Sequence, residues 1–427
     1  MKNILIAIRS IFKKGRHNVM KIVSLGIGLA VGLVLIAKVY FEQSYDDFYP
    51  DRDRVYQVWA KYQQNGGELK DYPQTSGGIA PTMQQQIPEI ETVTRYTSFG
   101  DWTFTMTDTK MKYSGRCIIA DSCFFDILPR PMLIGNAKEV LSTPMYVLIS
   151  SRIAKNIGGD VIGKNFTVDS SPGRTMTIGG VFEEVPENSH SRYDVIVSMA
   201  SAGRFMWEGS PTNMLGNDRY ISYVKLHKGV NPLALEEQVH TFVNSYFPPE
   251  EQQKTGFNIG FSFHELDGLH KELPQVKRMT WILSLLAFAL IFTAVMNYIL
   301  IVISSIVNRS KEVAVHKCYG ASENNIHGMM FGEALVHIVL SLILALLLIL
   351  AFRGTVEELL ATSLDSLLLS NGSLVLLGIC ILVFFVSGFM PGSLYARIPV
   401  ASAFRNYREN KRIWKKALLT MNSAARL

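Results

Sequence analysis

The segment from Gly158 to Asn165 comes closest in this chain to a site for nucleotide chemistry. Its sequence GGDVIGKN nearly fits the phosphate-binding loop GxxxxGK[ST], in which backbone N–H groups cradle phosphates and a final hydroxyl holds Mg²⁺. Asn165 stands at the last position and has no hydroxyl. We therefore interpret 158–164 as a glycine-rich turn ahead of a strand over 165–168. No other nucleotide-binding signature occurs, so the chain is predicted not to hydrolyse ATP by itself.

The histidines and cysteines also lack the spacing of a catalytic or metal site. The nine histidines show no HExxH or other ligand spacing, and no GxSxG nucleophile motif occurs. Cys117 and Cys123 could form a disulfide in an oxidising compartment, although the residues between them resemble a strand and a turn, which favours free thiols. Whether they pair stays open. The sequence predicts no cofactor, no metal and no catalytic residue.

Two polar residues, Asn297 and His337, lie within long apolar runs that could cross a membrane. A polar side chain in such a place is a candidate for ion or proton transport. A helix–helix hydrogen bond, worth about 1 kcal/mol, would explain either residue equally well. We favour the hydrogen bond, because no further acids or bases mark a route through the bilayer.

The composition separates a membrane part from a soluble part. Of 427 residues, 48% are hydrophobic and only 18% are charged, whereas soluble domains carry about 25% charge. Residues 42–278 contain 29 acidic and 23 basic residues, and the rest of the chain contains 7 acidic and 19 basic residues. Basic residues are thus concentrated beside apolar runs, as at cytoplasmic membrane edges, and nucleic acid is not expected as a partner.

Four apolar runs are long enough to cross a bilayer. They are 22–41, 279–307, 331–352 and 374–394. Lysines and arginines cluster before the first run, between the second and third, and after the fourth, and the positive-inside rule places these clusters in the cytoplasm. We therefore predict an α-helical membrane protein with four transmembrane helices and both termini in the cytoplasm. A large domain over 42–278 and a short loop over 353–373 would lie outside.

The remaining segments are predicted from their local patterns. Residues 1–21 suit an amphipathic helix on the inner leaflet, with a plain basic tail as the alternative, and 395–427 form a basic cytoplasmic tail. In 42–278, short β-branched and aromatic runs alternate with turn signals and with helices over 79–86 and 232–247, the second capped by Asn231. This is an α+β pattern.

Residues 308–330 join the second and third runs and form the segment that best suits a partner. Within them, RSKEVAVHKCYGAS (309–322) is typical of a short helix that ends at Gly320 in the left-handed conformation. Ser322 would then cap the next helix. Such a rigid elbow could fit a groove on a soluble protein. A plain basic loop is the alternative, and composition does not decide between them.

This elbow resembles the R-x-K-E-[IV]-x-[VI]-x-K-x-x-G-A-S signature of FtsX-like ABC transporter permeases of the MacB/LolC type. Further stretches are similar to the MacB-like periplasmic domain: SYDDFYP (44–50), DRVYQV (53–58), CFFDI (123–127), IGK (162–164) and GVFEEVPENSH (180–190). The matches follow the family order and cover most of the chain.

The resemblance implies a bacterial inner-membrane permease that is driven by a separate cytoplasmic ABC ATPase dimer and does not itself catalyse a reaction. The elbow residues expected to contact the ATPase are Arg309, Lys311, Glu312, Lys317, Gly320, Ala321 and Ser322. Closure of the ATPase would move the membrane helices and, through a stalk over 40–49 and 270–278, the periplasmic domain. The stalk residues are Tyr45, Phe48, Leu273 and Val276. This mechanotransmission would serve efflux or release of a drug, peptide or lipoprotein.

The resemblance also implies partners besides the ATPase. A second permease chain, identical or different, and membrane lipid are expected, with room for a periplasmic adaptor or an outer-membrane protein. Some family members carry a second anchor-plus-domain half, so the chain is either a half-size permease or part of a longer one. The alternative function is a membrane-anchored sensor or regulator with an extracytoplasmic ligand-binding domain. A neighbouring gene for a soluble ATPase would favour the permease.

Overall fold

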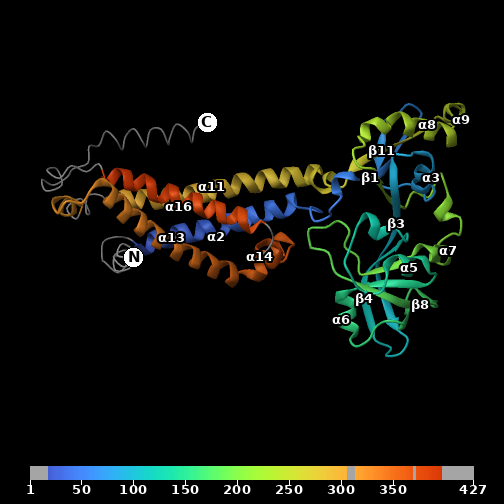
Figure 1. Ribbon diagram of the computed structural model, residues 1–427, viewed down its shortest axis with the longest axis horizontal. Coiled ribbons are helices and arrows are strands. Elements are labelled where there is room, and N and C mark those ends of the chain that lie inside the picture. The colour runs from blue at the N-terminus through green and yellow to red at the C-terminus, as the bar shows by residue number, and fades with distance from the viewer. Residues whose placement is uncertain (1–17, 305–312, 369–371, 397–427) are drawn as a thin grey trace. The chain divides into compact units, whose positions relative to one another are not determined.

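The computed structural model describes residues 18–304, 313–368 and 372–396, and the chain forms two compact units. One unit is Glu42–Val276, and the other combines Met1–Phe41 with Lys277–Leu427 (Figure 1). Most of the predicted amphipathic helix over 1–21 and nearly all of the basic tail over 395–427 lie outside the described residues.

A mixed eleven-stranded sheet forms the framework of Glu42–Val276. Its strands run in the order β11-β1-β10-β3-β4-β9-β6-β8-β5, with β2 paired to β1, and β7 to β3 and β8. The strands are β1 Val55–Gln64, β2 Lys70–Tyr72, β3 Ile90–Met106, β4 Lys112–Ala120, β5 Met132–Ile134, β6 Tyr146–Ser150, β7 Asn165–Val168, β8 Ser171–Phe182, β9 Val195–Ser198, β10 Ile221–Leu226 and β11 Phe257–Glu265. Among the strand pairs of the described chain, only β4 with β9 and β6 with β8 are parallel. With its helices, this unit confirms the predicted α+β class.

The long strand β3 connects two hydrophobic cores. Its first part packs with α3 (Ile79–Gln86), α8 (Glu236–Tyr246), β1, β10 and β11, and its second part packs with β4 and β6–β9. Figure 1 shows α3, α8 and β11 at one end of β3 and α6 (Ser151–Ile157) at the other. The strand bulges between Ser98 and Gly100, and Gly100 has φ +73°, a conformation that glycine adopts without strain.

One predicted helix is divided in the structure. Residues 232–247 form a 3₁₀ turn, Pro232–Leu235, followed by α8, whose N-cap position is Leu235 and has no side-chain capping bond. The prediction of one continuous helix over 232–247 is therefore wrong, whereas Pro232 is the first residue of the 3₁₀ turn and Asn231 directly precedes it, as expected. The other short helices of this unit are α4 Phe124–Ile127, α5 Ala137–Ser142, α7 Ala202–Phe205, α9 Pro249–Thr255 and α10 Gly268–Lys271.

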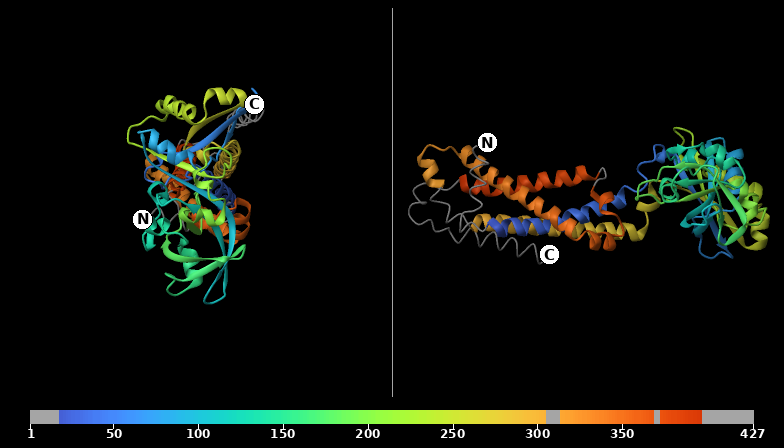
Figure 2. Two further views of the ribbon diagram at one scale, coloured as in Figure 1. Left: turned by 90° about the vertical axis from the view of Figure 1, so that its right-hand side faces the viewer. Right: turned by 90° about the horizontal axis from the view of Figure 1, so that it is seen from below.

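Four long helices lie side by side in the other unit (Figures 1 and 2). They are α2 Asn18–Gln43, α11 Pro274–Ser304, α13 Glu323–Ala351 and α16 Ser373–Ala396, and residues 353–368 add the short helices α14 Arg353–Leu360 and α15 Leu364–Leu368. The first three are long and apolar enough to cross a membrane. The apolar stretch found in α16, Ser373–Ser387, is shorter, so the fourth crossing stays a prediction.

Glycines on α2 allow close packing against α11. A Cβ atom on Gly28 would lie 2.2 Å from Cβ of Ala294, and one on Gly32 would lie 2.4 Å from Ile291 Cγ1. Small residues spaced four apart are a common means of helix association in membranes. The same unit contains the predicted helix–helix hydrogen bond of His337, whose Nδ1 lies 3.3 Å from the Tyr298 hydroxyl. Asn297 instead has an exposed side chain in the described chain.

Replacing Gly28 with leucine is expected to lower the stability of the helix bundle by about 1–3 kcal/mol, because the new side chain overlaps α11. The measurement is thermal unfolding of the full chain in detergent. Gly378→Leu is the matched control, since no atom lies within 4 Å of the added Cβ at that position. Equal midpoints for the two variants would contradict the packing described here.

Candidate functional site

The described part of the elbow ends in a glycine-capped turn. Residues 313–318 are helical, Gly320 has φ +86°, and its N–H donates to the Lys317 carbonyl at 3.0 Å. The N–H of Ala321 donates to the His316 carbonyl, also at 3.0 Å. This pair of bonds is the Schellman motif, in which a left-handed residue satisfies the last carbonyls of a helix. The predicted conformation of Gly320 is confirmed.

The next helix starts immediately after this turn. Ser322 has extended backbone angles, and its Oγ accepts the N–H of Asn325 at 3.3 Å, as an N-cap residue does. Two helices are thus joined through a stretch with few free backbone torsions. Lys317, Gly320, Ala321 and Ser322 lie together there, whereas Arg309, Lys311 and Glu312 lie outside the described residues.

The elbow helix has a buried side and an exposed side. Val313 and Ala314 are each 1% exposed and belong to the hydrophobic core of the helix bundle. Tyr319 is 89% exposed and Val315 is 43% exposed. The site prediction missed Tyr319, although a tyrosine next to the helix-ending glycine is a signal that it could have used. An exposed aromatic side chain on a rigid turn is suited to binding a partner.

In the unit Glu42–Val276, two segments that are distant in the sequence meet around a buried carboxylate. Asp46 is fully buried and has φ +59°. One of its carboxylate oxygens accepts from Ser189 Oγ at 2.8 Å, and the other lies 2.6 Å from His190 Nδ1. The N–H of Asp46 donates to the Asn188 carbonyl at 2.9 Å, and Asn188 donates back to the Ser44 carbonyl. We call these five residues the junction cluster.

The two chain segments next to α2 and α11 are also joined here. Glu42, in the last turn of α2, has a carboxylate oxygen 2.6 Å from His270 Nε2. Tyr45 stacks on the same imidazole, with ring centroids 3.6 Å apart. Next to them, Lys271 Nζ donates to Asp47 at 3.0 Å and to Asp267 at 2.8 Å. These contacts couple the segment that follows α2 to the segment that precedes α11.

The predicted stalk residues have different environments. Tyr45 is in the stack just described, and Val276 is buried, whereas Phe48 and Leu273 are 37% and 44% exposed. Phe48 contacts the ring of Tyr49, at a centroid distance of 4.3 Å. His270 and Lys271 carry the polar contacts of this region; they lie within the predicted stalk over 270–278 but were not singled out, because their partners are more than 200 positions away.

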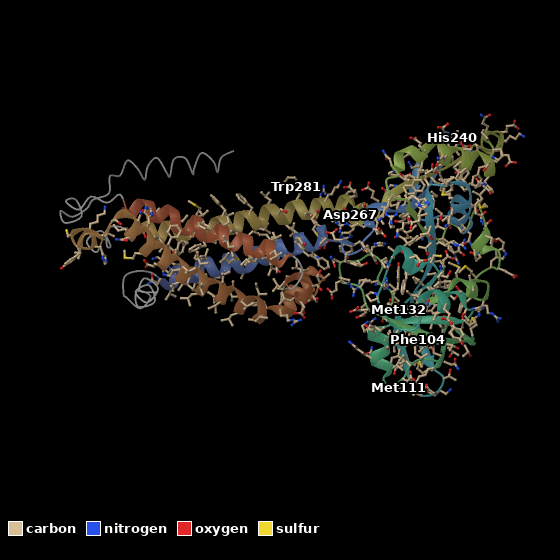
Figure 3. The ribbon with its side chains drawn as sticks, viewed as in Figure 1. Phe104, Met111, Met132, His240, Asp267 and Trp281 are labelled. Atoms are coloured by element: carbon tan, nitrogen blue, oxygen red, sulfur yellow. The ribbon has the colours of Figure 1, made fainter. Side chains whose placement is uncertain are left out.

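Burial and charge shift the acid–base behaviour of this region. Burial and the nearby Glu42 carboxylate raise the pKa of the Tyr45 phenol. Burial, the largest single influence, would raise the pKa of Asp267, but the hydrogen bonds with Lys271 and Asp47 and the charges of Lys271 and Arg52 together hold that pKa below its usual value. Burial alone would lower the pKa of Lys271, but its bonds to Asp267 and Asp47 raise it. Figure 3 labels Asp267 on the segment ahead of α11.

Asp267→Asn is therefore expected to lower the midpoint of thermal unfolding. The difference from the native chain should be largest between about pH 4 and pH 10. A carboxyl whose folded pKa is depressed stabilises the fold above its ordinary pKa, and loses that contribution as the pH falls through the folded value. The raised pKa of Lys271 gives a contribution that disappears as the pH rises through its folded value. Thermal unfolding across pH, with Asp126→Asn as control, measures this. A pH-independent difference would contradict it.

The glycine-rich segment 158–164 is a turn, as interpreted. It follows α6 and leads into β7, and Gly158, Gly159 and Gly163 have positive φ. A phosphate-binding loop instead follows a strand and opens a helix. The predicted strand over 165–168 is confirmed as β7. Cys117 is buried in β4, and it and Cys123 are free thiols.

Family comparisons agree with this architecture. Residues 20–242 match the MacB-like periplasmic core domain, and residues 284–400 match the FtsX-like permease C-terminal region. The first match alone covers more than half of the 427 residues. The chain belongs to the MacB/FtsX-like permease family. No curated protein matched the chain.

Among solved structures, the chain is similar to a domain described as that of a permease protein from Porphyromonas gingivalis. The identity is 33%, over 51% of this chain and 91% of that one, with a TM-score of 0.47. The periplasmic region of MacB from Actinobacillus actinomycetemcomitans is 16% identical over 52% and 92%, with a TM-score of 0.33. The extracellular domain of the ABC-type transporter YknZ from Gram-positive bacteria is 10% identical over 48% and 98%, with a TM-score of 0.34.

Proposed function

We propose that this MacB/FtsX-like permease is the non-catalytic membrane subunit of an ABC transporter that transmits ATP-driven motion to its exported domain. A cytoplasmic ATPase dimer binds the elbow, and a second permease chain completes the assembly. The rigid turn at 317–322, in which Tyr319 is exposed, is the observation that carries the proposal. The sequence contains no phosphate-binding signature, which agrees with ATP hydrolysis by a separate chain.

The contacts within each unit suggest how the motion travels. Val313 and Ala314 belong to the same hydrophobic core as residues of α11 and α13, so a push on the elbow would reach these helices through their packing. The chain continues from α2 into Glu42–Asp47 and enters α11 from Asp267–Leu273, and these two segments are bonded to each other. Relative movement of α2 and α11 would therefore act on the junction cluster.

The proposed orientation places Glu42–Val276 outside the bacterial inner membrane and the elbow in the cytoplasm. In a cysteine-free background, a membrane-impermeant maleimide added to intact spheroplasts is expected to label Gln64→Cys and not Tyr319→Cys, both at exposed positions. Permeabilised cells give the control, since both thiols should then react. Labelling of Tyr319→Cys alone in intact cells would contradict the orientation.

The partner is tested by purification in mild detergent and identification of the proteins that remain bound. A soluble ATPase with a phosphate-binding loop is expected, and adding the permease should stimulate its ATP hydrolysis. A sensor or regulator would work without such a companion. The family resemblance suggests that the substrate is a drug, peptide or lipoprotein that is moved by efflux or release. Its identification requires the ATPase to be known first.

A further inference from the structure

A cavity of about 640 Å³ borders the edge strand β11. One face of α8 lines it, including Val239 and Val243, and residues 259–263 of β11 line it in an unbroken run. Successive side chains of a strand point to opposite faces of the sheet. The cavity is lined by these five consecutive residues and also by Tyr56 and Lys61 of β1, so it extends across β11 to the free edge of the strand. Figure 3 shows His240, another lining residue, on α8.

The backbone of β11 offers free hydrogen-bonding groups along this edge. The strand pairs only with β1 in the described sheet. Leu266 N–H donates to the Val55 carbonyl, so the even-numbered residues of β11 face β1 and the odd-numbered ones face away. The outward N–H of Ile259 is bonded to Gln252 Oε1 at 3.1 Å. The outward N–H groups of Phe261 and Phe263 have no acceptor among the described residues.

This edge also lacks the features that normally prevent pairing. Natural edge strands are short, bulged, or interrupted by proline and charged residues. The opposite edge, β5, has three residues, whereas β11 has nine. The stretch Gly260–His264 reads GFSFH and contains neither proline nor a lysine, arginine or carboxylate. An unprotected edge next to an open groove is a site for strand addition.

We infer that this groove binds an extended segment of another exported polypeptide, which pairs with β11 as an additional strand and packs its alternate side chains under α8. The charges define the segment further. Glu265 lies opposite Tyr56 and Gly260 lies opposite Lys61, so an acidic and a basic group are offset along the strand by about 17 Å at 3.3 Å per residue and lie on opposite faces of the sheet. Glu236 adds a second carboxylate to the lining. The groove belongs to this half of the domain alone; that its partner is an exported polypeptide rests on the proposed orientation, whereas binding of the peptide described next is measured independently of that orientation.

A designed peptide tests this directly. Antiparallel to β11, acetyl-Ser-Lys-Thr-Val-Thr-Val-Asp-Ser-amide would place its lysine opposite Glu265, its valines on the α8 side, and its aspartate beside Lys61. Fluorescence anisotropy with the full chain in nanodiscs is expected to show saturable binding. Methylating the two valine nitrogens removes the donors to β11 and should weaken binding about tenfold or more. Glu265→Lys should weaken it about fivefold, and Lys155→Glu on α6 should have no effect.

A charge-exchanged peptide separates recognition from misfolding. Glu265→Lys combined with Lys61→Glu should regain binding when the lysine and aspartate of the peptide are swapped. The inference would be overturned if the peptide showed no saturable binding up to about 1 mM. It would also be overturned if the methylated and unmethylated peptides bound equally well, because the groove would then act as a small-molecule cavity. The inference would also be overturned if β11 of one copy of the chain cross-linked to β11 of a second copy and the peptide did not displace that contact.

Discussion

Gly320→Val is expected to reduce stimulation of the partner ATPase at least tenfold while the chain still inserts and folds. Gly320 has φ +86°, and a β-branched residue tolerates that conformation at a cost of about 1–3 kcal/mol. No atom lies within 4 Å of an added Cβ, so the effect comes from the backbone and not from a clash. The turn would open, and Tyr319 and Ser322 would lose their fixed spacing. ATPase activity of the reconstituted complex measures the loss.

The same position supplies its own control. Asparagine adopts the left-handed conformation more readily than other residues that carry a Cβ, so Gly320→Asn should keep most of the stimulation. Gly354→Val, in α14 where an added Cβ also has no neighbour within 4 Å, should keep it fully. Equal activity of Gly320→Val and Gly320→Asn would show that the capped turn does not transmit the motion.

Asp46→Ala is expected to destabilise Glu42–Val276 by about 3 kcal/mol or more and to uncouple ATP hydrolysis from transport. Its carboxylate is fully buried and accepts from Ser189, with His190 on its other oxygen. Removing it leaves buried polar groups without their acceptor, which costs more than the bond itself contributed. Thermal unfolding and hydrogen exchange at Asp46 and His190 measure the first effect.

Asp46→Asn provides a graded comparison. The amide keeps one acceptor oxygen and tolerates the positive φ, so Asp46→Asn should lose less stability than Asp46→Ala. Asp126→Ala is the surface control, because that side chain is 51% exposed and its ion-pair distance to Lys138 is 4.0 Å. If the midpoint of thermal unfolding of Asp46→Ala lay within about one degree of the Asp126→Ala value, the junction cluster would not stabilise Glu42–Val276 as described.

Features set by neighbouring residues could be predicted from the sequence. The conformation of Gly320 and the capping role of Ser322 follow from local backbone chemistry, and both are confirmed. The helix over 79–86 and the strand over 165–168 have the predicted bounds. The turn at 158–164 was distinguishable from a phosphate-binding loop by a single missing hydroxyl. In each case the decisive contacts lie within a few positions along the chain.

Features set by distant residues were not predictable. Asp46 and His190 are 144 positions apart, and only the folded sheet brings them together. The matched stretches 44–50 and 180–190 were recognised separately, without a reason to expect contact. The edge position of β11 depends on the order of all the strands. The exposure of Tyr319 depends on which side of the elbow packs into the bundle.

Hydrogen exchange on the reconstituted complex tests the transmission of motion most directly. With the partner ATPase present, ATP and vanadate should change the exchange of the Asp46 and Leu273 amides in the native chain and leave them unchanged in Gly320→Val. Unchanged exchange in the native chain while the bound ATPase is trapped by vanadate would contradict transmission from elbow to exported domain.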